Sequence, residues 1–268
     1  MVRDGPNRPP TVIEAGLWGF AAASSLIIGA VLAFAFDISP ARRGFILAFG
    51  AGTLLGAVAY ELIEDSLADS ERGIEVAIGF ALGALTFYFG SVLIERMQGS
   101  GGSSDAGGGD GGTGPARSGG RRAARSKGLA VLLGAVLDGI PESVVLGLSL
   151  IGGAGIGVPV LVAVFVSNVP EALSASEDLS ASGFTKRRII VTWVVVALVS
   201  GLASALGFVL LDTAPSFWVG LIQSFAAGAI LAMLAESMIP EAYEIGGRPV
   251  GLATCIGFAL AAYLSLRT

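Results

Sequence analysis

The sequence predicts an all-α integral membrane protein that crosses the bilayer eight times. Of its 268 residues, 53% are hydrophobic and 14% are charged, whereas soluble domains contain roughly 25% charged residues. The apolar residues also occur in runs of about 20, the length that a helix needs to cross a bilayer. Transmembrane strands are excluded because these runs are continuously apolar and do not alternate with polar residues.

Each of the eight runs is predicted to be one transmembrane helix. They cover residues 12–36, 44–63, 74–95, 128–151, 156–178, 188–211, 217–239 and 249–266. The first run is longer than the apolar core of a signal peptide, so we expect it to be retained. All eight belong to one predicted membrane domain, residues 1–268. Within it, the Gly/Ser/Arg-rich segment 99–128 is predicted to be a flexible cytosolic loop, because it has too few apolar residues to fold.

The basic residues predict the orientation, because loops rich in lysine and arginine stay in the cytoplasm. Twelve of the sixteen lysines and arginines fall on one side of the bilayer if the chain starts outside. Both termini are then outside, and we expect the protein to reside in the cell membrane. Orientation in a lipid bilayer already explains the positions of these basic residues. The bilayer is therefore an expected partner, and no nucleic-acid partner is expected.

An internal repeat relates spans two and three to spans seven and eight. Residues 49–55 (FGAGTLL) match 225–231 (FAAGAIL), and the sequence Gly-Phe-Ala-Leu occurs at both 79–82 and 257–260. Spans two and seven run in opposite directions, so the halves would be inverted repeats, which are typical of transporters. Small residues that recur for close helix packing are the alternative explanation. Spans four and five lie between the repeats, and the predicted order is three, two and three helices.

Spans four and five each carry a Pro-Glu step inside apolar sequence. The segments are DGIPE at 138–142 and SNVPE at 167–171. A charge at mid-bilayer costs about 2.5 to 3.5 kcal/mol, so carboxylates there indicate an ion or proton pathway. Each proline also removes a backbone donor and frees the carbonyl four residues earlier.

Helical spacing predicts that these polar groups converge. Residues four apart share a helix face, so Asp138 lies with Glu142, and Ser167 lies with Glu171. If the two spans pack antiparallel, three carboxylates, Ser167, the Asn168 amide and free carbonyls meet in one cavity. Such a shell of oxygen atoms would bind a cation.

The two segments resemble the metal-binding helices of the ZIP (Zrt/Irt-like) family of divalent metal transporters. In that family the fourth helix usually carries His-Asn-x-Pro-Glu-Gly, and the fifth carries a related pattern ending in x-Pro-Glu or x-Pro-His-Glu. The resemblance extends to eight spans, external termini, a cytosolic loop after span three and the inverted-repeat order. It implies a two-metal site, elevator-like alternating access and import toward the cytosol. Dimers are frequent in the family, so a homodimer is one assembly to expect.

The fourth span matches the family pattern only in part. Asp138 stands where the family usually has histidine, Gly139 stands at an asparagine, and Glu142 matches the family glutamate. Because Gly139 removes an amide from the second metal position, we expect one metal site instead of two.

The fifth span also matches the family pattern only in part. Ser167 occupies a position often filled by histidine or glutamine, Asn168 one filled by Asn, Asp or Glu, and Glu171 matches a glutamate ligand. The chain contains no histidine, and oxygen donors suit harder cations such as manganese or magnesium. Zinc stays open because carboxylates and water also bind it, and the family favours it.

Several acidic residues near the basic side receive weaker predictions. Glu236 in span seven is predicted to be an accessory metal ligand or exit residue, with a structural role in the cavity as the alternative. Glu177 and Asp178 could relay a departing ion or could simply end span five at the membrane surface. Glu241 and Glu244 lie in a predicted cytosolic loop, where we expect them to be solvated.

Together these features predict a transporter that moves a divalent metal cation, such as zinc, manganese or iron, toward the cytoplasm by alternating access. The metal is the substrate, and no prosthetic group is expected. A proton-coupled transporter of another solute is the main alternative, because clustered carboxylates also bind protons. An enzyme is not expected, since the chain lacks histidine, a recognisable nucleophile motif and a soluble catalytic domain. A scaffold would leave the buried carboxylates unexplained.

Overall fold

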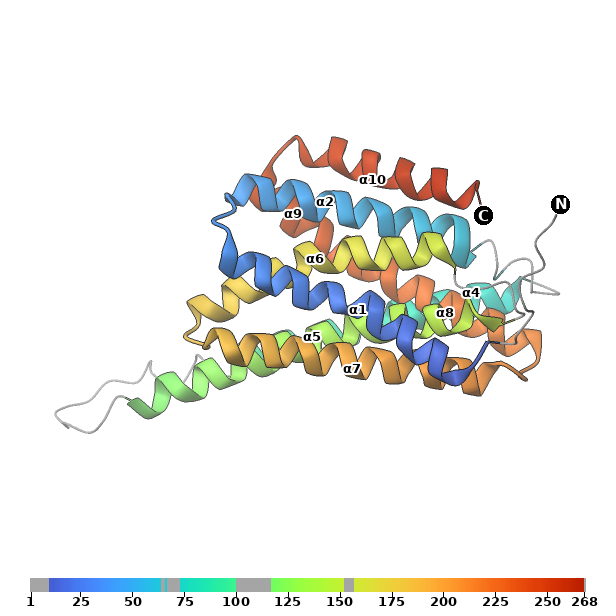
Figure 1. Ribbon diagram of the computed structural model, residues 1–268, viewed down its shortest axis with the longest axis horizontal. Helices are drawn as coiled ribbons and strands as arrows, with labels where there is room; N and C mark the ends of the chain where they lie inside the picture. Colours follow the sequence, from blue (N-terminus) through green and yellow to red (C-terminus); the bar gives the residue numbers. More distant parts are fainter. Residues whose placement is uncertain (1–9, 64–65, 67–72, 100–116, 152–156, 268) are drawn as a thin grey trace.

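The computed structural model describes residues 10–63, 66, 73–99, 117–151 and 157–267 and consists there of helices, with no strand (Figure 1). The elements are α1 (Val12–Ala35), α2 (Pro40–Ala57), η1 (Val58–Leu62), α4 (Ile74–Gly99), α5 (Arg117–Leu148), α6 (Val158–Ala181), α7 (Lys186–Leu211), α8 (Ser216–Met233), η3 (Leu234–Met238), α9 (Ile239–Gly246) and α10 (Val250–Ser265). Helix α2 runs on into η1, and α8 runs on through η3 into α9. Seven of the resulting helices are long and apolar enough to cross a membrane, and α10 is a shorter apolar helix. The predicted all-α membrane class is confirmed.

Two helices extend by well over one turn beyond their predicted spans. Helix α5 begins at Arg117, so the basic end of segment 99–128 is helical, while residues 100–116 lie outside the described residues. Alanine, arginine and lysine are good helix formers, and this stretch only prolongs a helix that is already nucleated. Span seven continues through Pro240 into α9, where a cytosolic loop was predicted.

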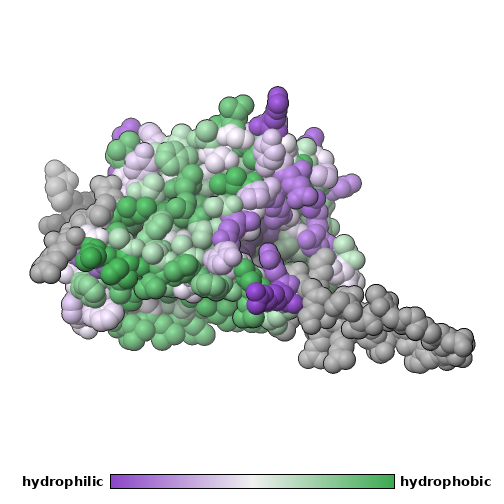
Figure 2. Space-filling model, turned by 180° about the vertical axis from the view of Figure 1, so that it is seen from behind, coloured by the Kyte–Doolittle hydropathy of each residue, from purple (hydrophilic) through white to green (hydrophobic). Residues whose placement is uncertain are grey.

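The ends of the bundle differ in charge. The connections from α1 to α2, α6 to α7 and α9 to α10 lie together at one end, and both described chain ends lie at the other (Figure 1). We call the first the basic end because its described residues include Arg42, Arg43, Lys186, Arg187, Arg188 and Arg248. Figure 2 shows hydrophobic residues over the middle of the bundle and hydrophilic residues gathered toward the basic end. Exposed leucines such as Leu202, Leu210 and Leu252 form the kind of apolar surface that a membrane covers.

The helices form two groups. The first consists of α1, α5, α6 and α7, which all contact one another. Hydrogen bonds reinforce it, from the Trp193 indole to the Ser176 hydroxyl (2.8 Å) and from the Ser204 hydroxyl to the Ala15 carbonyl (2.8 Å). The second group consists of α2 packed on α10, α4 packed on α8, and the short α9 packed on α2. The groups meet mainly where α2 contacts α6 and where α5 contacts α4 and α8.

Helices α2 and α8 share a local deformation, because each widens into a π-helical segment. Segment η1 begins at Val58 and η3 begins at Leu234. These two residues are as far apart in the chain as the matched Phe49 and Phe225, so the two segments are equivalent in the sequence repeat. Pro240 accounts for the widening at η3, because its ring lacks a donor and clashes with a preceding carbonyl. Segment η1 contains no proline, so proline alone does not cause the deformation.

Close glycine contacts reveal a one-turn error in the predicted repeat. Gly52 of α2 lies against the backbone of Thr254 in α10, and its counterpart Gly228 of α8 lies against the backbone of Phe80 in α4. Neither glycine has room for a side chain. Packing thus pairs Phe80 with Thr254, whereas the sequence match pairs it with Phe258. Small and apolar residues recur at helical spacing here, so adjacent turns resemble each other. The complete order of three, two and three inverted helices stays a prediction.

Candidate metal site

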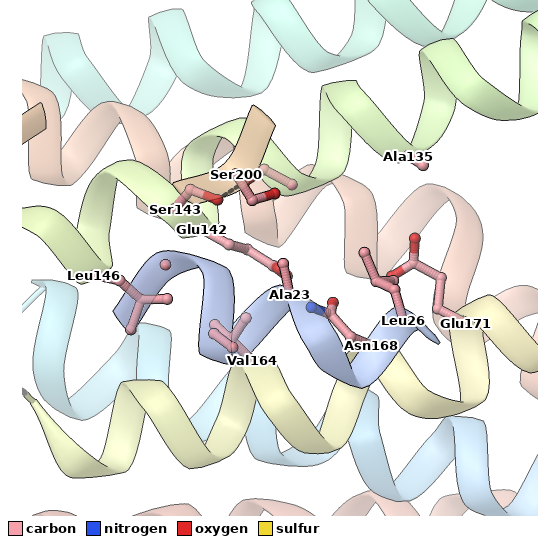
Figure 3. A pocket seen from close by; sticks show the side chains of 13 residues that line it. Ala23, Leu26, Ala135, Glu142, Ser143, Leu146, Val164, Asn168, Glu171 and Ser200 are labelled. Carbon is pink, nitrogen blue, oxygen red and sulfur yellow. Dashed lines mark hydrogen bonds between the residues drawn. The ribbon is translucent and has the colours of Figure 1, made fainter. Parts of the chain in front are cut away.

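The two Pro-Glu segments meet at an enclosed cavity inside the first helix group. Its polar lining consists of Glu142, Ser143, Asn168, Glu171 and Ser200 (Figure 3). The remaining lining residues are small or apolar and come from α1, α5 and α6: Gly19, Ala22, Ala23, Leu26, Ala135, Gly139, Leu146 and Val164. The free volume is about 10 Å³, which accommodates the centre of about one water-sized particle.

Local sequence explains why the helices approach here. Pro141 and Pro170 lie inside α5 and α6, where each removes one intrahelical hydrogen bond next to the following glutamate. On α1, small residues face the cavity, and an added Cβ at Gly19 would clash with Ser204 of α7. Small residues permit such close packing of helices in membranes. The site is therefore narrow, and its walls are apolar except for the groups from α5, α6 and α7.

Glu142 is the most enclosed of the carboxylates. Its side chain is 2% exposed, and its Oε1 atom is buried without a hydrogen-bond partner among the described residues. A buried carboxylate oxygen without a partner is strongly unfavourable, because it has lost its hydration. The arrangement calls for a cation or a proton at this position.

Glu171 and Asp138 are the other two carboxylates of the Pro-Glu segments. Glu171 lines the cavity, whereas Asp138 does not, although the charge of Asp138 acts on both glutamates. Across the described residues, no three His, Cys, Asp or Glu side chains are arranged to hold one metal ion directly. In the geometry described, an ion touching Glu142 or Glu171 would therefore need Asn168, a serine, backbone or water as further ligands.

The two polar residues at the start of the α6 segment face different ways. Asn168 is 5% exposed and points into the cavity between the two glutamates (Figure 3). Ser167 is fully buried, donates to the Val164 carbonyl (3.0 Å) and lies against Gly50 of α2. Consecutive residues of a helix point in directions about 100° apart, so only one of the pair reaches the cavity.

Glu236 lies apart from the other predicted ligands. It is exposed in η3, and its Oε2 accepts a hydrogen bond from the Ser91 hydroxyl of α4 at 3.1 Å. It does not line the cavity. In this geometry Glu236 could assist transport only along the route of the ion to or from the cavity, and not as a ligand in the cavity.

Sequence reasoning missed three residues around the cavity. Ser143 and Ser200 line it, and no pattern distinguishes them from other serines in membrane helices. Glu241 was predicted to be solvated in a loop, but it belongs to α9, accepts a hydrogen bond from the Ser174 hydroxyl (2.5 Å) and acts electrostatically on Glu171. A signal was present, because Ile239-Pro240-Glu241 repeats the Ile-Pro-Glu of α5.

Comparison with known proteins identifies the relatives of this chain. No protein-family model matches it. The "putative zinc transporter" of Arabidopsis thaliana is 24% identical over 266 residues, which is 98% of this chain and 40% of that protein. The zinc transporter zipt-7.2 of Caenorhabditis elegans is 31% identical over 109 residues, 38% of this chain and 23% of that protein. Both proteins are named as zinc transporters, which supports a relationship of the chain to the ZIP family. The chain thus spans less than half the length of these ZIP relatives.

These matches support the ZIP resemblance that the sequence predicts. Nearly the whole chain takes part in the match to the Arabidopsis protein, so the relationship is not confined to one motif. Together with the apolar helices, it identifies an integral membrane protein. The two ZIP relatives are named as transporters and not as enzymes.

Proposed function

We propose that the protein transports a divalent metal cation across the membrane, with carboxylates of α5 and α6 as ligands. The buried, unpartnered Oε1 of Glu142 carries this proposal, because it faces a cavity of one-ion size together with Glu171 and Asn168. Transmembrane positions are costly for a carboxylate that binds nothing. The names of both relatives support a metal ion as the substrate.

The donor set favours a single ion and leaves a choice of metals. With no histidine in the chain, the donors are oxygen atoms, which suit manganese and other hard cations better than imidazole does. Zinc is supported by the names of the relatives, and carboxylates and water also bind zinc. The small free volume and Gly139 support one site.

Alternating access is supported by the division into two helix groups. Every residue lining the cavity comes from the first group, so that group could carry the ion as a unit past the second. The equivalent π-helical segments in α2 and α8 support an inverted-repeat scaffold of the kind that transporters use. The expected direction of transport, toward the cytoplasm, rests on the family resemblance, and the positive-inside rule places the basic end on that side. The cell membrane and a homodimer stay predictions of the sequence.

Uptake into proteoliposomes tests the proposal. We expect the purified protein to take up at least one of zinc, manganese, iron or cobalt, and Glu142→Gln to abolish that uptake while the variant inserts normally. Glu244→Gln, an isosteric change outside the cavity, is the control and should transport normally. Unchanged uptake by Glu142→Gln would refute the proposal.

A proton-coupled transporter of another solute is the second candidate. It is favoured by the same unpartnered Glu142 oxygen, which could hold a proton, and by the lack of three convergent ligand side chains among the described residues. Solute uptake that follows a pH gradient and is indifferent to divalent metals would select this alternative.

A further inference from the structure

A carboxylate from the second helix group lies beside the cavity of the first. Ser174 of α6 donates a hydrogen bond of 2.5 Å to Oε1 of Glu241 in α9. Ser174 lies three residues after Glu171, so the two occupy neighbouring positions on one side of α6. Glu241 thus lies next to the turn of α6 that carries Glu171. Helix α9 therefore contributes to the electrostatics of a cavity that it does not line.

Packing fixes the position of Glu241. Ala242 next to it is fully buried, and α9 lies so close to α2 that Gly44 has no room for a side chain against Gly246. Nearer the end of α6, an ion pair between Arg43 of α2 and Glu177 joins the same two helix groups. The Glu241 contact is thus part of an ordered interface between the helix groups, even though its side chain is exposed.

We propose that Glu241 is a positioning residue that raises the affinity of the cavity for a divalent cation across the interface between the helix groups. This inference rests on the proposed function. A divalent cation in the cavity is attracted by the negative charge of Glu241 across the interface, so a bound cation stabilises the contact between α6 and α9. By the same linkage, the cation binds more tightly while the contact is formed and less tightly when the groups separate.

Equilibrium binding to the purified full chain in lipid nanodiscs tests the inference, with Mn²⁺ and Zn²⁺ as probes. We expect Glu241→Gln to raise Kd about fivefold or more, because a charge near a partly buried site is removed. Glu241→Asp keeps the charge and should stay within about twofold of wild type, and Ser174→Ala, which only frees the carboxylate, should give an intermediate Kd. The difference between wild type and Glu241→Gln should also shrink as salt screens the exposed charge.

Two matched controls separate this role from a structural one. Glu244→Gln removes a neighbouring charge from α9, and Ser91→Ala removes a serine–glutamate hydrogen bond, to Glu236, that stays inside the second group. Both should bind like wild type. If wild type binds, Glu142→Gln does not, and Glu241→Gln binds like wild type, the inference is wrong while the proposed function stands. If wild type binds neither metal, or Glu142→Gln binds like wild type, the proposed function fails and the inference fails with it.

Discussion

The two Pro-Glu segments have similar sequences but different surroundings. Glu142 of α5 is 2% exposed, is enclosed by the first helix group and leaves one oxygen without a partner. Glu171 of α6 is only half-buried and senses the charge of Glu241 from the second group. The difference indicates a division of roles, in which α5 supplies a fixed ligand and α6 supplies the ligand that communicates with the rest of the molecule.

Exchanging each glutamate for glutamine should separate these roles. We expect Glu142→Gln to remove uptake entirely, whereas Glu171→Gln should lower kcat/KM by about 10- to 100-fold, the effect of losing one charge-assisted ligand. Water can replace a ligand at the half-buried position but not at the enclosed one. Initial uptake rates over a range of metal concentrations measure both. A more severe defect in Glu171→Gln than in Glu142→Gln would reverse the assignment.

The same exchange at α5 should not destabilise the protein. Glu142→Gln removes a buried charge that has lost its hydration, so thermal unfolding in detergent without added metal should occur at the same temperature as in wild type or higher. Added metal should raise the unfolding temperature of wild type and leave that of the variant unchanged. A large loss of stability in the metal-free variant would indicate instead a structural role for the carboxylate.

Asp138 should have a smaller effect than either glutamate, because it acts on the cavity through its charge without lining it. Asp138→Asn should raise KM by about threefold to tenfold and leave kcat nearly unchanged. Uptake kinetics with manganese and zinc measure this. The variant Asp138→His gives the opposing test, since a new preference for zinc would mean that position 138 touches the ion.

Ser167 and Glu236 should have the smallest effects. Ser167→Ala changes a hydroxyl that already bonds to Val164 and faces α2, and Glu236→Gln changes an exposed group bonded to Ser91. Uptake by each variant should stay within about twofold of wild type. A tenfold loss in Ser167→Ala would mean that α6 rotates during transport, which would bring Ser167 into the cavity.

The sequence predicts where the helices of this protein lie in the chain better than it predicts which of their side chains point into the cavity. Long apolar runs predicted eight spans, of which seven are helices long and apolar enough to cross a membrane and the last is a shorter apolar helix. The internal charges pointed to Glu142, Asn168 and Glu171, which all line the same cavity. Helical spacing could not decide between Ser167 and Asn168, because both lie on the polar side of α6 and only packing against α2 separates them. The helical position of Glu241 was missed, although its Ile-Pro-Glu sequence repeats that of α5, because a proline at the end of an apolar run is typical of a helix end.

The π-helical segments were also beyond prediction from local sequence. Segment η3 precedes a proline, but η1 reaches the same conformation without one. What the two share is their place in matched helices, each packed on an outer helix of the second group. A proline contributes at η3 alone, so no single local sequence pattern predicts both segments.

The central claim is that one divalent cation binds between α5 and α6 on Glu142. Its most direct test is the stoichiometry of manganese or zinc bound to the purified protein at saturation, compared between wild type and Glu142→Gln. The account predicts about one ion per chain for wild type, as the size of the cavity allows, and none at the same metal concentration for the variant. Equal binding by the two proteins would contradict it.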